Sequence, residues 1–233
     1  MLEYSFDEDE GSVILDTSGH GRDGDLFGAQ YEPNGRIGGG LKLDGTNHYA
    51  ELDSGLPLAG RSFTLAVWAR PNASQQPCCE SGRQDIFSMG VGQPDQGLQF
   101  GYEWDGYFLV HFWDDGLFSD QSYTDNEQWH HWGATYEQTT KELLLYRDGT
   151  VVGSDTTADD FMGTGTLVIA RGAMSPFTVS YFGGVLDEVQ AYDRALSATD
   201  MTNLFVRGHS ALITYTAVVE SAGSYTITNA DQA

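Results

Sequence analysis

Short runs of alternating or aromatic-rich residues recur along the whole chain, and clusters of Gly, Asn and Asp separate them. Alternation with a period of two is typical of β-strands, whereas the 3.6-residue period of an amphipathic helix is nearly absent. Asp105-Gly106 and Asp148-Gly149 are strong signals for tight hairpins. The pattern predicts strands over 3–6, 40–43, 48–52, 62–70, 85–89, 98–103, 107–113, 130–137, 142–148, 166–170 and 184–192. This number of strands in one block predicts an all-β fold of two packed antiparallel sheets.

One short surface helix is expected near the C-terminal end. Ser197-Ala-Thr-Asp200 has the form of a capping box, with Asp in place of the commoner Glu or Gln. Apolar residues then recur at helical spacing, namely Leu196, Met201, Leu204 and Phe205.

The length of 233 residues fits one β-sandwich domain, expected over residues 1–207. Residues 208–233 contain a further possible hairpin, with strands at 211–219 and 224–228. We interpret this extension as an extra edge hairpin of the sandwich; the alternative is the start of a following module.

The composition limits the classes of molecule that the chain is expected to bind. The chain has 34 acidic and 11 basic residues, a formal net charge of −23 at pH 7. Such a field repels phosphate, which argues against nucleic acids and anionic membrane surfaces as partners. No apolar run approaches the ~18 residues of a spanning helix, so membrane insertion is not expected. Cys78 and Cys79 are adjacent and cannot staple distant segments, which leaves the redox compartment open.

An ordered set of segments carries a family resemblance. The segments are Asp16-Thr-Ser-Gly19-His-Gly21, Gly39-Gly-Leu-Lys-Leu-Asp44-Gly45, Phe63-Thr-Leu-Ala-Val-Trp68, Trp129-His-His-Trp-Gly-Ala-Thr-Tyr136, Leu145-Tyr-Arg-Asp-Gly149, and Gly184-Val-Leu-Asp187-Glu188-Val189 followed by Tyr192-Asp-Arg-Ala-Leu-Ser197. Together they resemble the LamG-like jelly rolls of the concanavalin A-like lectin/glucanase superfamily over residues 1–207. The resemblance implies a two-sheet jelly-roll β-sandwich with its first and last strands adjacent.

A loop near the N-terminus is rich in oxygen ligands. Asp16, Ser18 and His20 alternate there and Gly21 bends the chain, which suits a hard cation. The EF-hand interpretation fails, because flanking helices are missing and Phe27 stands where that loop needs Glu.

The resemblance implies one structural calcium ion. Carried over by residue, it assigns Asp16 and Asp187 as carboxylate ligands, His20 as a backbone-carbonyl ligand, and Asp44 as a carbonyl or carboxylate ligand. On the residues alone, Asp187 shares a strand face with two valines, where an uncompensated carboxylate is costly. The alternative is that Asp16 and Asp44 organise turns and that Asp187 pairs with Arg171 or Arg194.

The residues argue against catalysis. Laminarinase-type glucanases carry Glu-x-Asp-x-Glu on one strand, and the nearest sequence here is Glu103-Trp-Asp105-Gly-Tyr107, where tyrosine replaces the third acid. The Asp-Gly pair inside it is itself a turn signal. We therefore expect no enzyme activity.

An aromatic and acidic stretch favours sugar binding. Alternation over 107–113 assigns Phe108, Val110 and Phe112 to the inner face. The exposed candidates for glycan contact are Trp104, Tyr107, His111 and Trp113. Sugars are recognised by aromatic faces together with carboxylates or amides. The alternative is that these side chains cover the second side of a buried strand.

The sequence thus predicts a non-catalytic, calcium-containing carbohydrate-binding module of a larger extracellular or cell-surface protein. Its expected partners are a polysaccharide or glycan and other modules of the same parent protein. An adhesion or spacer module without a defined sugar is the second hypothesis, and a polysaccharide hydrolase or lyase of the same fold is the third.

Overall fold

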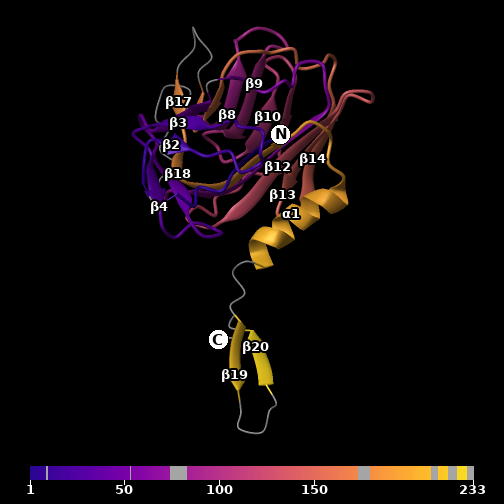
Figure 1. Ribbon diagram of the computed structural model, residues 1–233. Helices are drawn as coiled ribbons and strands as arrows, with labels where there is room; N and C mark the ends of the chain where they lie inside the picture. The colour runs from indigo at the N-terminus through magenta and orange to yellow at the C-terminus, as the bar shows by residue number, and fades with distance from the viewer. Residues whose placement is uncertain are drawn as a thin grey trace.

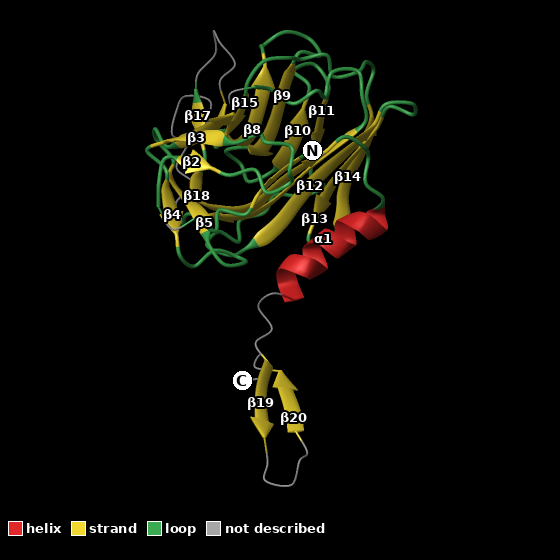
Figure 2. Cartoon of the chain, in the orientation of Figure 1, coloured by secondary structure: helices red, strands yellow, loops and turns green. Residues whose placement is uncertain are grey.

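The computed structural model describes residues 1–8, 10–52, 54–73, 83–172, 179–210, 215–219 and 225–229. Cys78 and Cys79, and parts of the hairpin expected after residue 208, lie outside these ranges. Two large antiparallel sheets and one helix make up most of the described chain (Figures 1 and 2). The predicted all-β jelly-roll sandwich is confirmed.

The first sheet has the order β14-β13-β12-β7-β18-β5-β4, and β1 also pairs with β18. Its strands are β1 (Leu2–Tyr4), β4 (Gln30–Glu32), β5 (Gly40–Asp44), β7 (Phe63–Pro71), β12 (His130–Glu137), β13 (Glu142–Arg147), β14 (Thr150–Thr156) and β18 (Gly183–Tyr192). Because β1 lies antiparallel beside β18, the start of the chain is joined to the last strand of the sandwich by backbone hydrogen bonds.

The second sheet has the order β11-β10-β9-β8-β15-β6-β3-β2. Its strands are β2 (Val13–Ile14), β3 (Gly24–Phe27), β6 (Tyr49–Leu52), β8 (Gln84–Gly90), β9 (Gly97–Tyr102), β10 (Phe108–His111), β11 (Gly116–Phe118) and β15 (Leu167–Ile169). Two small ribbons are separate from both sheets: β16 (Arg171–Gly172) with β17 (Ser180–Tyr181), and β19 (Tyr215–Val219) with β20 (Tyr225–Asn229).

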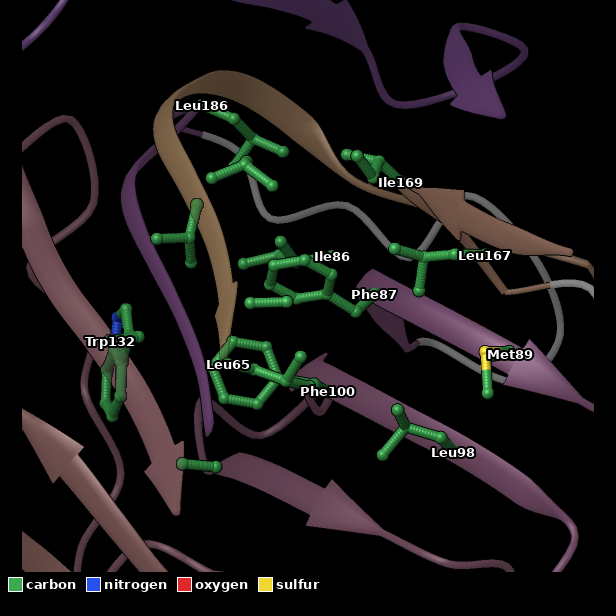
Figure 3. Packing of buried hydrophobic residues seen from close by; sticks show 14 of the residues in the cluster. Leu65, Ile86, Phe87, Met89, Leu98, Phe100, Trp132, Leu167, Ile169 and Leu186 are labelled. Carbon is green, nitrogen blue, oxygen red and sulfur yellow. The ribbon is translucent and has the colours of Figure 1, made fainter. Parts of the chain in front are cut away.

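The inner faces of the two sheets enclose one hydrophobic core. Figure 3 shows Leu65 and Trp132 of the first sheet facing Phe87 and Phe100 of the second. The Trp132 ring stacks on Phe108 at 3.9 Å between centroids, and its Nε1–H donates to the Tyr102 hydroxyl at 2.7 Å. Burying such large rings supplies much of the stabilisation of the sandwich.

Helix α1 (Ala198–Ser210) covers part of the outer face of the first sheet. The predicted capping box is confirmed, since Asp200 N donates to Ser197 Oγ at 3.1 Å and Ser197 N donates to Asp200 Oδ2 at 3.1 Å. Met201 is fully buried against this sheet. A Cβ on Gly133 would lie 2.1 Å from Met201 Cε, so glycine permits the close approach of the helix.

In the part of the chain that the structure describes, no helix has the length and apolar character needed to cross a membrane.

Candidate functional site

A tight turn between β9 and β10 presents Trp104 to solvent. Glu103 N donates to Tyr107 O at 2.8 Å and Gly106 N donates to Glu103 O at 3.1 Å. Gly106 has φ +86°, a left-handed conformation that glycine adopts without strain. The turn leaves the Trp104 side chain 69% exposed at its tip. The hairpin predicted from Asp105-Gly106 is therefore present.

The residues predicted for the inner face of β10 do face the core. Phe108, Val110 and Phe112 are fully buried in the core. On the other side Tyr107 and His111 are half-buried. The half-buried Trp113 has φ +79°, and its backbone N–H donates to His111 Nδ1 at 2.9 Å.

The four predicted sugar-contacting residues lie at the two ends of β10. Trp104 and Tyr107 belong to the turn before it, whereas His111 and Trp113 are at its far end. Four residues along a strand span about 13 Å. The set is therefore not a single aromatic platform.

Polar side chains and the fully buried Leu109 lie between these ends on the outer face of the second sheet, where Asp85, Ser88 and Gln99 are also buried. The register places Gln99 opposite both His111 and Ser88, and Glu103 opposite Tyr107. We call Asp85, Ser88, Gln99, Glu103 and His111, with the adjoining Arg83, the outer polar face.

Hydrogen bonds connect most of the outer polar face. Arg83 donates from Nη1 to Gln99 Oε1 at 2.6 Å and from Nε to Glu103 Oε1 at 2.9 Å. Gln99 Nε2 donates to Asp85 Oδ2 at 3.3 Å, and the Ser180 hydroxyl of β17 donates to the same oxygen. The network fixes the positions of these side chains.

Burial shifts the pKa of two groups in this face. It raises the pKa of the Asp85 carboxyl to about 6, against the opposing charge of Arg83. Among the described residues, Asp85 Oδ1 has no hydrogen-bond partner. Burial, reinforced by Arg83, lowers the pKa of His111 to about 4. His111 is therefore neutral at pH 7, and because Nδ1 accepts from Trp113, its proton lies on Nε2, which is a donor.

Arg83 and Gln99 were not predicted as site residues. The signal for Gln99 is present in the alternation of 98–103, where Leu98, Phe100 and Tyr102 are in the core. The alternating odd positions, which include Gln99 and Glu103, therefore lie on the outer face. Nothing in the local sequence of Arg83 indicates its partners, which come from a different strand.

The structure also places each predicted calcium ligand. Asp16 Oδ1 accepts from Glu3 N at 3.1 Å and Ser18 N at 3.0 Å, and Oδ2 accepts from Arg22 N at 3.0 Å. Burial raises the pKa of Asp16, but hydrogen bonds with Ser18, Arg22 and Glu3 outweigh it and hold the pKa below its usual value. His20 is exposed, and its Nδ1 lies 3.0 Å from Ser18 Oγ.

Asp44 organises the turn after β5. Its Oδ1 accepts the backbone N–H groups of Thr46, Asn47 and His48 at 2.9–3.0 Å. Burial opposes these contacts, but with the Thr46 hydroxyl they hold the pKa of Asp44 well below its usual range. The register pairs Asp44 with Gly183, four positions or about 13 Å along β18 from Asp187.

Asp187 is fully buried and organises a different turn. Its Oδ2 accepts from Arg36 N and Ile37 N, each at 2.7 Å, and its Oδ1 accepts from Glu188 N at 2.7 Å. Burial raises the pKa of Asp187 to about 8, with the Ile37 amide opposing. Its partners are main-chain amides; the two arginines considered from sequence pair with Glu51 and Asp200 instead.

The carboxylates of Asp16, Asp44 and Asp187 thus each accept backbone amides of a different turn. Within the described ranges, no three His, Cys, Asp or Glu side chains converge as metal ligands would. Asp16 connects the N-terminal loop to β1, because it accepts a hydrogen bond from Glu3 N. Glu3 in turn pairs with Gln190 of β18, the last strand of the sandwich.

Comparisons with known proteins cover most of the chain. The family model described as the concanavalin A-like lectin/glucanases superfamily matches residues 44–202. A comparison with curated protein sequences gives no match.

Domain 4 of AbnA, a GH43 extracellular arabinanase from Geobacillus stearothermophilus, in complex with arabinotriose, matches with a TM-score of 0.67 and 20% identity, over 87% of this chain and 96% of that one. The binding domain of Paraclostridial Mosquitocidal Protein 1 matches with a TM-score of 0.70 and 15% identity, over 98% of this chain and 63% of that one. Trypanosoma rangeli sialidase in complex with sialic acid matches with a TM-score of 0.65 and 16% identity, over 90% of this chain and 33% of that one. At these identities the similarity establishes the fold alone.

Proposed function

This chain belongs to the concanavalin A-like lectin/glucanase superfamily, and from that premise we propose that it is a non-catalytic carbohydrate-binding module. The observation that carries the proposal is the exposed indole of Trp104 at the tip of the β9–β10 hairpin, beside the outer polar face. An exposed aromatic ring next to ordered acceptors and donors is the composition of a sugar-binding surface.

Each part of this surface has a role in the proposal. The face of Trp104 packs against the C–H face of a sugar ring. Arg83 holds Oε1 of Glu103 and thereby fixes this carboxylate, whose Oε2 then accepts a sugar hydroxyl. At the far end of β10, the Nε2–H of the neutral His111 donates to a sugar oxygen.

The charge around the hairpin favours a neutral sugar chain. Glu103, Asp105, Asp114 and Asp115 lie on or beside β10. Acidic polysaccharides would be repelled from this end of the sheet. The similar arabinanase domain is in complex with arabinotriose, a neutral oligosaccharide, and this supports arabinan as the first polysaccharide to test.

Two features support a non-catalytic role. A retaining glycosidase needs two carboxyl groups about 5 Å apart, one of them free to act as nucleophile. Glu103 is instead held in an ion pair with Arg83, and Asp105 belongs to the turn, where its Oδ1 faces Tyr107 N.

Affinity gel electrophoresis tests this proposal. We expect a gel containing arabinan, xylan, galactan or β-glucan to retard the wild-type chain. Trp104→Ala should abolish retardation, whereas the matched control Phe118→Ala, which also removes an exposed ring from the second sheet, should preserve it. Absence of retardation in every gel would favour the adhesion or spacer hypothesis. New reducing ends or unsaturated products would instead identify an enzyme.

Location and calcium complete the proposal. We propose an extracellular or cell-surface location within a larger protein. The net charge of −23 supports this location, because salt there screens the repulsion between the acidic side chains.

The proposal of a bound calcium ion rests on the family resemblance alone. If calcium is bound, chelation with EDTA should lower the melting temperature. An unchanged melting temperature, with no heat of binding on adding calcium back, would contradict it.

A further inference from the structure

A cavity of about 290 Å³ lies on the first sheet. It is formed by β4, β5, β7 and β18 with the segment that precedes β12. Its lining includes Glu32, Lys42, Arg70, Asn72, Glu127 and Val185. Its volume is at the lower end of the range for small-molecule sites, which suits one sugar ring rather than a longer chain.

The sheet register brings two cations together in this cavity. Val185 of β18 pairs with Lys42 of β5 on one side and with Arg70 of β7 on the other. Cross-strand partners share a face, so both long side chains leave the sheet on the two sides of the small Val185 floor. Lys42 and Arg70 therefore flank a gap of two strand spacings, about 10 Å between backbones.

These two cations are not held in a close ion pair, as several other basic residues of the described chain are. Lys141, the other lysine, pairs with Asp160, and Arg147 pairs with Asp125. No ion pair among the described residues includes Lys42 or Arg70. Two carboxylates, those of Glu32 and Glu127, line the same cavity, but neither forms a close ion pair with Lys42 or Arg70.

The rest of the cavity supplies groups for hydroxyls. Asn72 offers an amide, and Glu32 and Glu127 offer carboxylate acceptors on different sides. The Arg70 guanidinium lies 5.1 Å from the centroid of the Trp129 ring, a cation–π contact that restrains it.

We propose that this cavity binds a single sugar residue that carries a carboxylate. The carboxylate lies between Lys42 and Arg70 and accepts charge-assisted hydrogen bonds from both. The sugar hydroxyls bond to Asn72, Glu32 and Glu127. This site is independent of the hairpin site, which lies on the other sheet and favours neutral sugars.

Isothermal titration calorimetry with four small probes tests the site. D-Glucuronate and N-acetylneuraminate represent the two sources of carboxylated sugar, D-glucose lacks the charge, and acetate lacks the hydroxyls. We expect at least one acidic sugar to bind, with glucose and acetate each at least tenfold weaker. Lys42→Gln and Arg70→Gln should each weaken binding about tenfold. Arg61→Gln is the matched control, since it removes one exposed charge at the opposite end of β7 and should change nothing.

Three results would overturn the proposal. They are no binding of either acidic sugar, equal binding of glucose or acetate, and unchanged affinity in both glutamine variants. Lys42 is exposed, so its substitution should preserve the melting temperature and keep the comparison valid. Trp104→Ala should keep acidic-sugar binding while losing retention in neutral polysaccharide gels. Failure of one site is therefore distinguishable from failure of the other.

Discussion

Trp104 and Trp132 show how the position of one residue type decides its role. Trp104 is 69% exposed on a turn, whereas Trp132 is fully buried, stacked on Phe108 and hydrogen-bonded to Tyr102. Trp132→Ala should therefore cost about 3–5 kcal/mol in the free energy of unfolding, and Trp104→Ala less than about 0.5 kcal/mol. Urea denaturation measures both. A large loss for Trp104→Ala would assign its indole to the core and remove it as a sugar contact.

His131 gives the molecule a pH dependence of known sign. Its imidazole is buried beside Trp68, and burial lowers its pKa to about 4, with Asp148 opposing. Between pH 6.5 and 4 the unfolded chain binds a proton at this residue and the folded chain does not, so stability falls as the pH falls. The effect amounts to roughly 3 kcal/mol if the shift is complete.

Comparison of the wild type with His131→Gln isolates this effect, because the other titrating groups contribute equally to the stability of both proteins. The stability of the wild type relative to the variant, from denaturation at pH 7, 6, 5 and 4, should decrease over this range. A stability difference that stays constant with pH would show that His131 has the same pKa in the folded and the unfolded chain.

At the scale of elements, helix α1 depends on a small number of local contacts. Ser197 caps its first turn through a reciprocal pair of hydrogen bonds with Asp200. Ser197→Ala should lower the free energy of unfolding by about 1 kcal/mol. Thermal melting with Ser154→Ala, which changes an exposed residue of β14, as a surface control checks this. No loss in Ser197→Ala would show that packing of Met201 alone holds the helix.

The long strands could be predicted from the sequence because each alternates over many residues. Phe63, Leu65 and Val67 of β7 lie in the main core, and Ala66 lies in the cluster beneath α1, as a strand covered on both faces requires. Strands of two to four residues, such as β2, β3 and β11, are too short to carry a period. Strand β14 has no buried residue and is positioned by its hairpin with β13, after the predicted Asp148-Gly149 turn.

The candidate site could be predicted only in part, because only some of its residues follow from a local sequence pattern. Trp104 follows from a local turn signal, and the inner face of β10 follows from alternation. The meeting of Gln99 with His111 and Ser88 depends on the register of three strands, which local pattern does not fix. The turn-organising roles of Asp16 and Asp44 match one of the two interpretations drawn from sequence. Asp187 accepts from main-chain amides and does not pair with Arg171 or Arg194.

At the scale of the whole molecule, the net charge of −23 opposes the compact state. Salt shortens the Debye length from about 30 Å at 0.01 M to about 3 Å at 1 M and so screens this repulsion. The melting temperature should therefore rise between 0.01 M and 0.5 M NaCl, measured by differential scanning calorimetry at pH 7. A melting temperature that falls with salt would mean that surface ion pairs outweigh the repulsion.

The central claim is that a neutral sugar chain binds along the β9–β10 hairpin and the outer polar face. Its most direct test is two-dimensional NMR of the labelled chain titrated with neutral oligosaccharides, arabinotriose first. The account predicts that backbone resonances between residues 99 and 113 shift, that they stay fixed in Trp104→Ala, and that those of β4 and β5 do not move. If none of the oligosaccharides shifts the 99–113 resonances, or the shifts are confined to the first sheet, the account is contradicted.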